Sequence, residues 1–183
     1  MRWMAIVLAV AIWMGCTEHA QRQRDHEETG DVLFESYEVD MTWGYRLSGF
    51  YIEKDGSVWT YEQSDTPWYP EHLQPGELFS RDLVTKHKNA RQIGKVDPVQ
   101  LRDMAQLIKP ASHGPIAHAA GSNAGDGGLD VAYLFDPETS IYYEVILAGR
   151  GNRVAMNRAP EAQILRDYLE HVKELVQPEP ERP

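Results

Sequence analysis

The chain has a single cysteine, few basic residues and no hydrophobic run long enough to span a membrane. One cysteine among 183 residues excludes an intrachain disulfide and any zinc site built from several cysteines. Lys and Arg number 18 against 28 Asp and Glu, so the formal net charge is −10. We do not expect so acidic a chain to bind nucleic acid, because contacts to phosphate need a cationic face. The apolar run at residues 5–13 is too short to cross about 30 Å of hydrocarbon as a helix.

The composition is that of a folded protein, with 42% hydrophobic, 25% charged and 10% aromatic residues. Its length suggests one domain. Residues 17–30 contain no large apolar side chain and mix both signs of charge, which is typical of a flexible segment. Residues 177–183 contain three prolines and are expected to form a disordered tail. The sequence therefore predicts one folded body over residues 31–176.

The first residues have the features of a secretory signal peptide. Arg2 precedes the apolar run at residues 5–13, and the small residue Gly15 follows it. A basic start, a short apolar core and a small residue at the cleavage site are typical of such signals. We therefore predict that residues 1–15 form a signal peptide that is removed.

Residues 13–16, Trp-Met-Gly-Cys, resemble the lipobox of bacterial lipoproteins in Gly15 and Cys16, although Trp13 and Met14 depart from its usual pattern. The resemblance implies cleavage before Cys16, diacylation of its thiol by fatty acids such as palmitate, and often acylation of the new amine. Several acyl chains would anchor the protein stably to the lipid bilayer, where one chain would not. Thr17 in place of Asp favours the outer membrane, facing the periplasm or the exterior. Residues 16–30 would then be the lipidated Cys and a flexible tether.

Several segments of the body have the alternation of strands. Residues 33–41 alternate with one mostly apolar face, and residues 48–53 and 57–61 flank an Asp-Gly turn that predicts a hairpin. Residues 129–135 and 141–147 predict a second hairpin, joined by the turn at 136–139. A further strand is expected around residues 83–85 and 92–93, after a proline-rich loop at 64–78. Residues 86–91 carry the only basic concentration of the body.

Two helices complete the prediction. Asp97 and Pro98 have the residue types of an N-cap and a first helical position, and the apolar period continues to Lys109, where Pro110 is expected to stop the helix. The last helix is expected at residues 160–176. Strands outside a βαβ alternation favour an α+β fold with a mainly antiparallel sheet of five to six strands and two helices. This layout is similar to that of several small lipoprotein domains.

The search for a catalytic or metal site finds only weak candidates. There is no G-x-S-x-G motif, and acylation would remove Cys16 as a nucleophile. His113 and His118 lack the helical spacing of a zinc pair. Asp126 and Asp130 flank glycines in a loop at 122–130 that has too few side-chain oxygens for calcium. We expect no metal, no cofactor and no catalytic residue, and the alternative is a metal-dependent envelope enzyme using the loop at 113–130.

Exposed aromatic and arginine residues are the candidate contact residues. The aromatic residues of the first half of the chain are more often core than contact residues. Trp68 and Tyr69 are the best contact candidates among them, because they lie in the proline-rich loop. Arg150 and Arg153 follow a strand and suit an anion or carboxylate contact, although the sequence favours a turn with solvated arginines over such a site. The sequence thus favours a non-enzymatic interaction domain that binds an unknown protein, peptide or envelope component. An inhibitor or immunity-type protein whose acidic surface covers a basic partner is one version.

Overall fold

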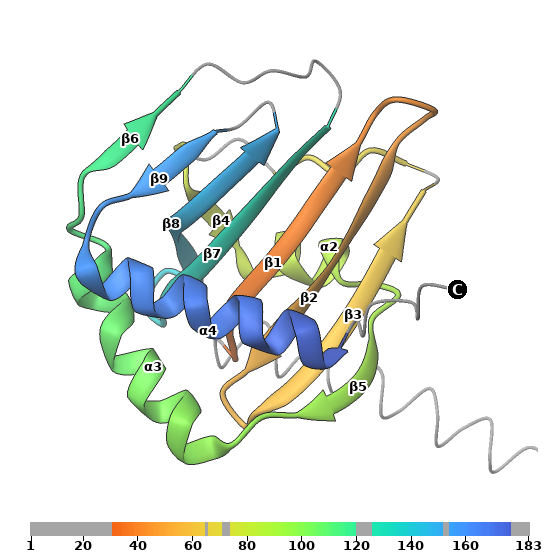
Figure 1. Ribbon diagram of the computed structural model, residues 1–183. Coiled ribbons are helices and arrows are strands. Elements are labelled where there is room, and N and C mark those ends of the chain that lie inside the picture. The colour runs from red at the N-terminus through yellow and green to blue at the C-terminus, as the bar shows by residue number, and fades with distance from the viewer. Residues whose placement is uncertain (1–30, 65, 71–73, 120–125, 152–153, 177–183) are drawn as a thin grey trace, which may run out of the picture.

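The computed structural model describes residues 31–64, 66–70, 74–119, 126–151 and 154–176 (Figure 1). The predicted signal peptide, Cys16, the tether and the proline-rich tail lie outside these residues. None of the helices in the described part of the chain combines the length and apolar character that a membrane crossing requires.

A single mainly antiparallel sheet forms the centre of the molecule. Its described strands are β1 (Val32–Asp40), β2 (Arg46–Glu53), β3 (Ser57–Gln63), β4 (Glu77–Phe79), β5 (Arg91–Lys95), β6 (Ile116–His118), β7 (Asp126–Asp136), β8 (Ile141–Gly151) and β9 (Ala155–Asn157). They are arranged in the order β5-β3-β2-β1-β7-β8-β9-β6, and β4 pairs with β8. Both predicted hairpins are present, and Gly56 in the Asp-Gly turn has a φ of +86°, which favours glycine. The two hairpins meet through β1 and β7.

Two helices cover one face of the sheet, α3 (Pro98–Ala111) and α4 (Pro160–Val176) (Figure 1). The Asp97 side chain accepts hydrogen bonds from the backbone N–H groups of Val99 and Gln100, as its N-cap role requires. The core beneath these helices is mostly aliphatic and includes Leu165 and Leu169 of α4. The predicted helix at residues 160–176 is therefore confirmed, and its apolar side chains are part of the core.

The short helix α2 (Ser80–Lys86) lies on the opposite face of the sheet (Figure 1). The core on this face is rich in tyrosine. Its buried tyrosines come from five strands and are Tyr37, Tyr51, Tyr61, Tyr133 and Tyr142.

The α+β class and the mainly antiparallel sheet are confirmed, but the counts differ from the prediction. The described residues form nine strands and three helices, instead of five to six strands and two helices. Residues 83–85 belong to helix α2 and not to a strand. Of the expected strand, only residues 92–93 are confirmed, as part of β5. Pro110 lies inside the last turn of α3, which continues to Ala111. The strands β4, β6 and β9 have three residues each, too few for a sequence period to reveal.

Candidate functional site

A buried ion pair lies at the centre of the α2 face. The Glu35 carboxylate lies 2.9 Å from Nζ of Lys86 and 3.0 Å from Nε2 of His87. The hydroxyl groups of Tyr61 and Tyr133 donate hydrogen bonds to the same carboxylate. Both Glu35 and Lys86 are 0% exposed. Two opposite charges are thus removed from water together, which is favourable only when the partners are well placed.

The charges around Glu35 determine its ionisation. Burial is the largest single influence. By itself it would raise the pKa of Glu35, because it removes water from the charged form. The attraction of Lys86 and His87, together with the hydrogen bonds from His87 and Tyr133, outweighs burial and holds the pKa of Glu35 well below its ordinary value. Burial and the charge of Glu35 raise the pKa of Tyr61 and Tyr133 well above the usual range. The carboxylate is therefore ionised while both tyrosines keep their protons.

Hydrogen bonds beside the buried ion pair join α2 to β3 and to the loop between β3 and β4. Nε2 of Gln63 donates hydrogen bonds to the carbonyl oxygens of Thr85 and Lys86, at 2.9 and 2.5 Å. Nε1 of Trp68 donates a 3.1 Å hydrogen bond to the carbonyl oxygen of Asp82. Because Glu35 has no exposed surface, we assign these contacts a structural role, which is to position the side chains around Trp68.

An apolar hollow of about 310 Å³ lies next to this cluster. We call it the aromatic hollow; it is lined by Tyr37, Val39, Met41, Tyr45, Trp68, Tyr69, Pro70, Leu78, Gly127 and Glu144. The backbone N–H of Trp68 donates a 2.9 Å hydrogen bond to the Tyr45 hydroxyl, which joins the two loops that form its wall. Burial raises the pKa of Tyr45, so this hydroxyl stays neutral.

Large apolar side chains are exposed at the rim of the aromatic hollow. Tyr69 is 75% exposed and Met41 is 49% exposed, while Trp68 is half-buried. Trp43, in the loop between β1 and β2, is 96% exposed. The structure therefore brings the predicted contact residues Trp68 and Tyr69 together with Met41, Tyr45 and Tyr37. The sequence had indicated neither the hollow nor these partners from β1 and the loop that follows it.

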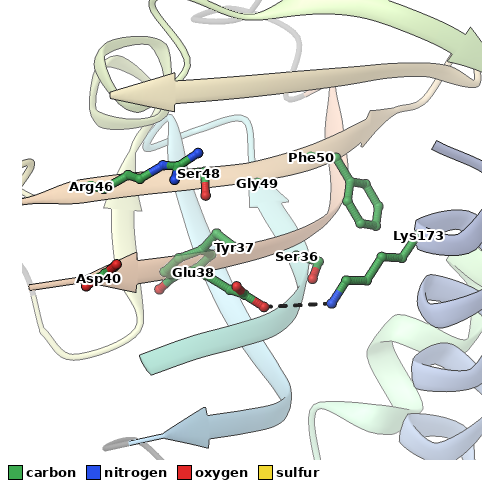
Figure 2. Close-up of a pocket in the computed structure, with 9 residues that line it drawn as sticks. All are labelled: Ser36, Tyr37, Glu38, Asp40, Arg46, Ser48, Gly49, Phe50 and Lys173. Carbon is green, nitrogen blue, oxygen red and sulfur yellow. Dashed lines mark ion pairs between the residues drawn. The ribbon is translucent and has the colours of Figure 1, made fainter. Parts of the chain in front are cut away.

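A second hollow, of about 320 Å³, lies on the other face of the sheet beside the end of α4 (Figure 2). Its lining is mainly polar. Figure 2 shows the Lys173 side chain extending from α4 towards Glu38 on β1, and the two charged groups are 3.7 Å apart. We call this the polar hollow. Its cationic and anionic side chains lie close enough to compensate one another.

Arg150 belongs to β8 and pairs with groups of its own sheet. Its Nη1 lies 2.5 Å from Oδ2 of Asp130, and its Nη2 lies 3.7 Å from Glu38. The Ser36 hydroxyl donates a 2.7 Å hydrogen bond to the other Asp130 oxygen. Arg150 is thus engaged by carboxylates, which leaves it less suited to an external anion. Arg153 lies outside the described residues.

Of the residues of the alternative metal site, His113, His118 and Asp130 are not brought together. His118 lies on β6 and Asp130 on β7, with β8 and β9 between them. Three strand spacings amount to about 14 Å. Nδ1 of His113 lies 2.8 Å from the carbonyl oxygen of Lys109, at the exposed end of α3. Residues 120–125 of the glycine-rich loop are outside the described part, and within that part no cluster of three potential metal ligands forms.

The buried Glu35–Lys86 pair is the main feature that the sequence analysis missed. Glu35 is the one charged residue on the apolar face of residues 33–41, and the basic concentration begins at Lys86. A carboxyl group on a buried face needs a partner. This requirement indicates that Glu35 has a buried partner. The sequence does not identify Lys86 as that partner, because the two residues are 51 positions apart.

Comparison of the chain with protein-family models, curated proteins and solved structures finds no match. The function is therefore inferred from the geometry of the chain itself.

Proposed function

We propose that the protein is a membrane-tethered lipoprotein of the cell envelope whose folded body is a non-enzymatic binding domain. The contact surface is the aromatic hollow and its exposed rim. The observation that carries this proposal is the grouping of Trp68, Tyr69, Tyr45 and Met41 around one hollow of about 310 Å³.

The composition of this surface supports a protein contact. Aromatic residues and methionine are enriched in the buried centres of protein interfaces, and tyrosine and tryptophan dominate their binding energy. Contiguous exposed apolar patches are unusual on soluble domains unless they contact something. Tyr69 and Trp43 are both largely exposed, and a partner would remove their apolar surface from water.

The position of the hollow supports a partner outside the anchoring membrane. The predicted tether from Cys16 leads into Val32, the first residue of β1. The hollow is lined by Val39 and Met41 at the other end of that strand, about 24 Å away at the usual rise per residue. The hollow is thus at the end of β1 that is remote from the predicted tether, where the anchor does not obstruct a partner.

The anchor is tested by replacing its proposed acyl acceptor. We expect Cys16→Ser to abolish fatty-acid labelling and to release the protein from membranes or leave it unprocessed. Thr17→Ser changes the adjacent hydroxyl residue and serves as the control, with labelling retained. Unchanged labelling of Cys16→Ser would contradict the lipoprotein proposal.

The contact surface is tested by photo-crosslinking in intact envelopes. The photoreactive residue p-benzoyl-phenylalanine replaces Tyr69 in one variant and Tyr143 in the control. Tyr143 is an exposed tyrosine that follows buried Tyr142 in β8, so it points to the opposite face. We expect a discrete protein adduct from position 69 alone. Equal adducts from both positions, or none from either, would contradict the assigned surface.

A further inference from the structure

The aromatic hollow combines aromatic rings with a carboxyl group. Its ten described lining residues include Tyr37, Tyr45, Trp68, Tyr69 and Glu144, and none of the ten is basic. The negative face of an aromatic ring attracts a cation, most strongly when water is excluded. The whole chain has a formal net charge of −10. The lining and the net charge both favour a positively charged occupant.

The protein already holds one cation against two of these rings. Nζ of Lys86 lies 3.5 Å from the ring centroid of Tyr37 and 4.9 Å from that of Trp68. The Glu35 carboxylate, 2.9 Å from the same Nζ, compensates this charge. The buried lysine therefore adds little net repulsion against a second cation in the hollow. Tyr45 and Tyr69 offer further rings in the lining.

We propose that the aromatic hollow binds an arginine side chain from a basic segment of a partner protein. This inference rests on the proposed binding function and specifies the chemistry of the partner. The guanidinium group lies against the rings of Tyr45 and Tyr69, and acidic side chains around the hollow attract the rest of the basic segment. Electrostatic attraction of this kind speeds association and selects against acidic partners.

The size of the hollow and the chemistry of arginine support this choice. A volume of about 310 Å³ is at the lower limit of small-molecule pockets, about 300–1,000 Å³, and suits a single side chain. Arginine is favoured over lysine because its planar guanidinium stacks on aromatic rings and is more weakly hydrated than an ammonium group. Arginine is also enriched in interface centres together with tyrosine and tryptophan.

Two other occupants fit the observations less well. A second copy of this chain would bring another net charge of −10 to the same surface, which opposes association. A lipid surface is disfavoured because bacterial anionic lipids repel an acidic body. The crosslinking experiment at position 69 distinguishes a second copy and a lipid from a partner protein.

The test measures peptide binding to the full-length protein in non-ionic detergent by titration calorimetry. The probes are a short peptide of alternating glycine and arginine, its lysine analogue, and its citrulline analogue. Citrulline keeps the shape of arginine without its charge. The variants are Tyr69→Ala, which removes a ring, and Tyr69→Phe, which keeps it. Tyr143→Ala is the control for losing an exposed tyrosine elsewhere.

We expect the arginine peptide to bind at least about tenfold more weakly to Tyr69→Ala than to the natural chain, the equivalent of one ring contact with a desolvated cation. Tyr69→Phe and the Tyr143→Ala control should stay within about twofold, which is a few tenths of a kcal/mol. The lysine peptide should bind more weakly than the arginine peptide, and the citrulline peptide weakest of all. Because Tyr69 is 75% exposed, Tyr69→Ala should keep the same thermal midpoint, which shows that it is folded.

Other outcomes would overturn this inference. Equal binding to Tyr69→Ala would show attraction by the acidic surface in general, and equal binding of the citrulline peptide would show an apolar site without preference for a cation. A position-69 crosslink to a protein, without selective arginine binding, would overturn the inference and leave the proposed function standing. A crosslink from position 69 only to a second copy of this chain, or only to lipid, would overturn the proposal of a partner protein that supplies an arginine. Failure of both experiments would overturn both proposals.

Discussion

On one face of the sheet, α3 and α4 cover a core of mostly aliphatic side chains, whereas on the other face α2 covers tyrosine rings and a buried ion pair. The two faces are joined by the same strands, since successive residues of β1 point to opposite sides. Phe34 belongs to the aliphatic side and Glu35 to the tyrosine side.

The difference shows two ways of holding a helix on a sheet. α4 has 17 residues and buries a long apolar stripe, so its attachment is spread over many contacts. α2 has seven residues and cannot bury an equal area. Its attachment depends on Lys86 and on the Gln63 hydrogen bonds, which are directional and concentrated. We therefore expect the α2 face to be more sensitive to single polar changes.

The largest effect is expected from Lys86→Met. This change leaves the Glu35 carboxylate buried without its lysine, and such losses cost about 3–5 kcal/mol of unfolding free energy. Lys173→Met, on the other face, breaks only a half-exposed pair and should cost less than about 1 kcal/mol. Urea unfolding measures both. Equal losses for the two lysines would remove the proposed contrast between the faces.

A double variant separates charge burial from packing. Glu35→Gln combined with Lys86→Met removes both charges, so we expect it to recover part of the stability lost in Lys86→Met alone. A double variant that is less stable than Lys86→Met would show that the ion pair contributes mainly through packing and hydrogen bonds.

The next effect is expected in α4. Leu165→Ala or Leu169→Ala removes a fully buried side chain from the aliphatic core, and each should lower the unfolding free energy by at least about 2 kcal/mol. Ile164→Ala, at a 46% exposed position of the same helix, is the matched control and should change it by no more than about 0.5 kcal/mol. Equal unfolding free energies of all three variants in denaturant melts would show that α4 is peripheral.

Acid should weaken the α2 face selectively. The pKa of Glu35 is held well below its ordinary value of 4.5 in the folded protein. The stability that the ionised Glu35 contributes is therefore fully present above pH 4.5. It decreases as the pH falls, because Glu35 then takes up a proton in the unfolded chain only. The loss is about 1.4 kcal/mol for each pH unit below that value. Unfolding curves at falling pH should have a shallower pH dependence in the Glu35→Gln/Lys86→Met variant, and identical dependences would contradict this origin.

The smallest effect is expected at the start of α3. Asp97→Ala removes the acceptor of the Val99 and Gln100 N–H groups and should cost about 1 kcal/mol. Asp103→Ala removes the same charge from an exposed position within α3 and is expected to cost less than about 0.5 kcal/mol. Equal melting temperatures of the two variants would show that the cap contributes only through its charge.

Local chemistry explains which elements could be predicted. The Asp55-Gly56 turn, the Asp97-Pro98 helix start and the α4 stripe each depend on neighbouring residues, and all three are confirmed. Residues 83–85 were wrongly predicted as strand because Val84 and Thr85 are β-branched. They are helical in a segment whose Phe79 N–H donates a 3.0 Å hydrogen bond to Asp82 and whose Lys86 reaches Glu35. Those contacts outweigh a weak local preference.

The sequence by itself determined the α+β class, the two hairpins, the ends of α4 and the choice of Trp68 and Tyr69 as contact candidates. These depend on periodicity and turn chemistry within a few positions of the chain. Only the tertiary structure decided that β1 pairs with β7, that Lys86 meets Glu35, and that Tyr37 and Met41 complete the aromatic hollow. Each of these contacts joins residues far apart in the chain, and their pairing follows from packing and charge compensation that no local pattern encodes.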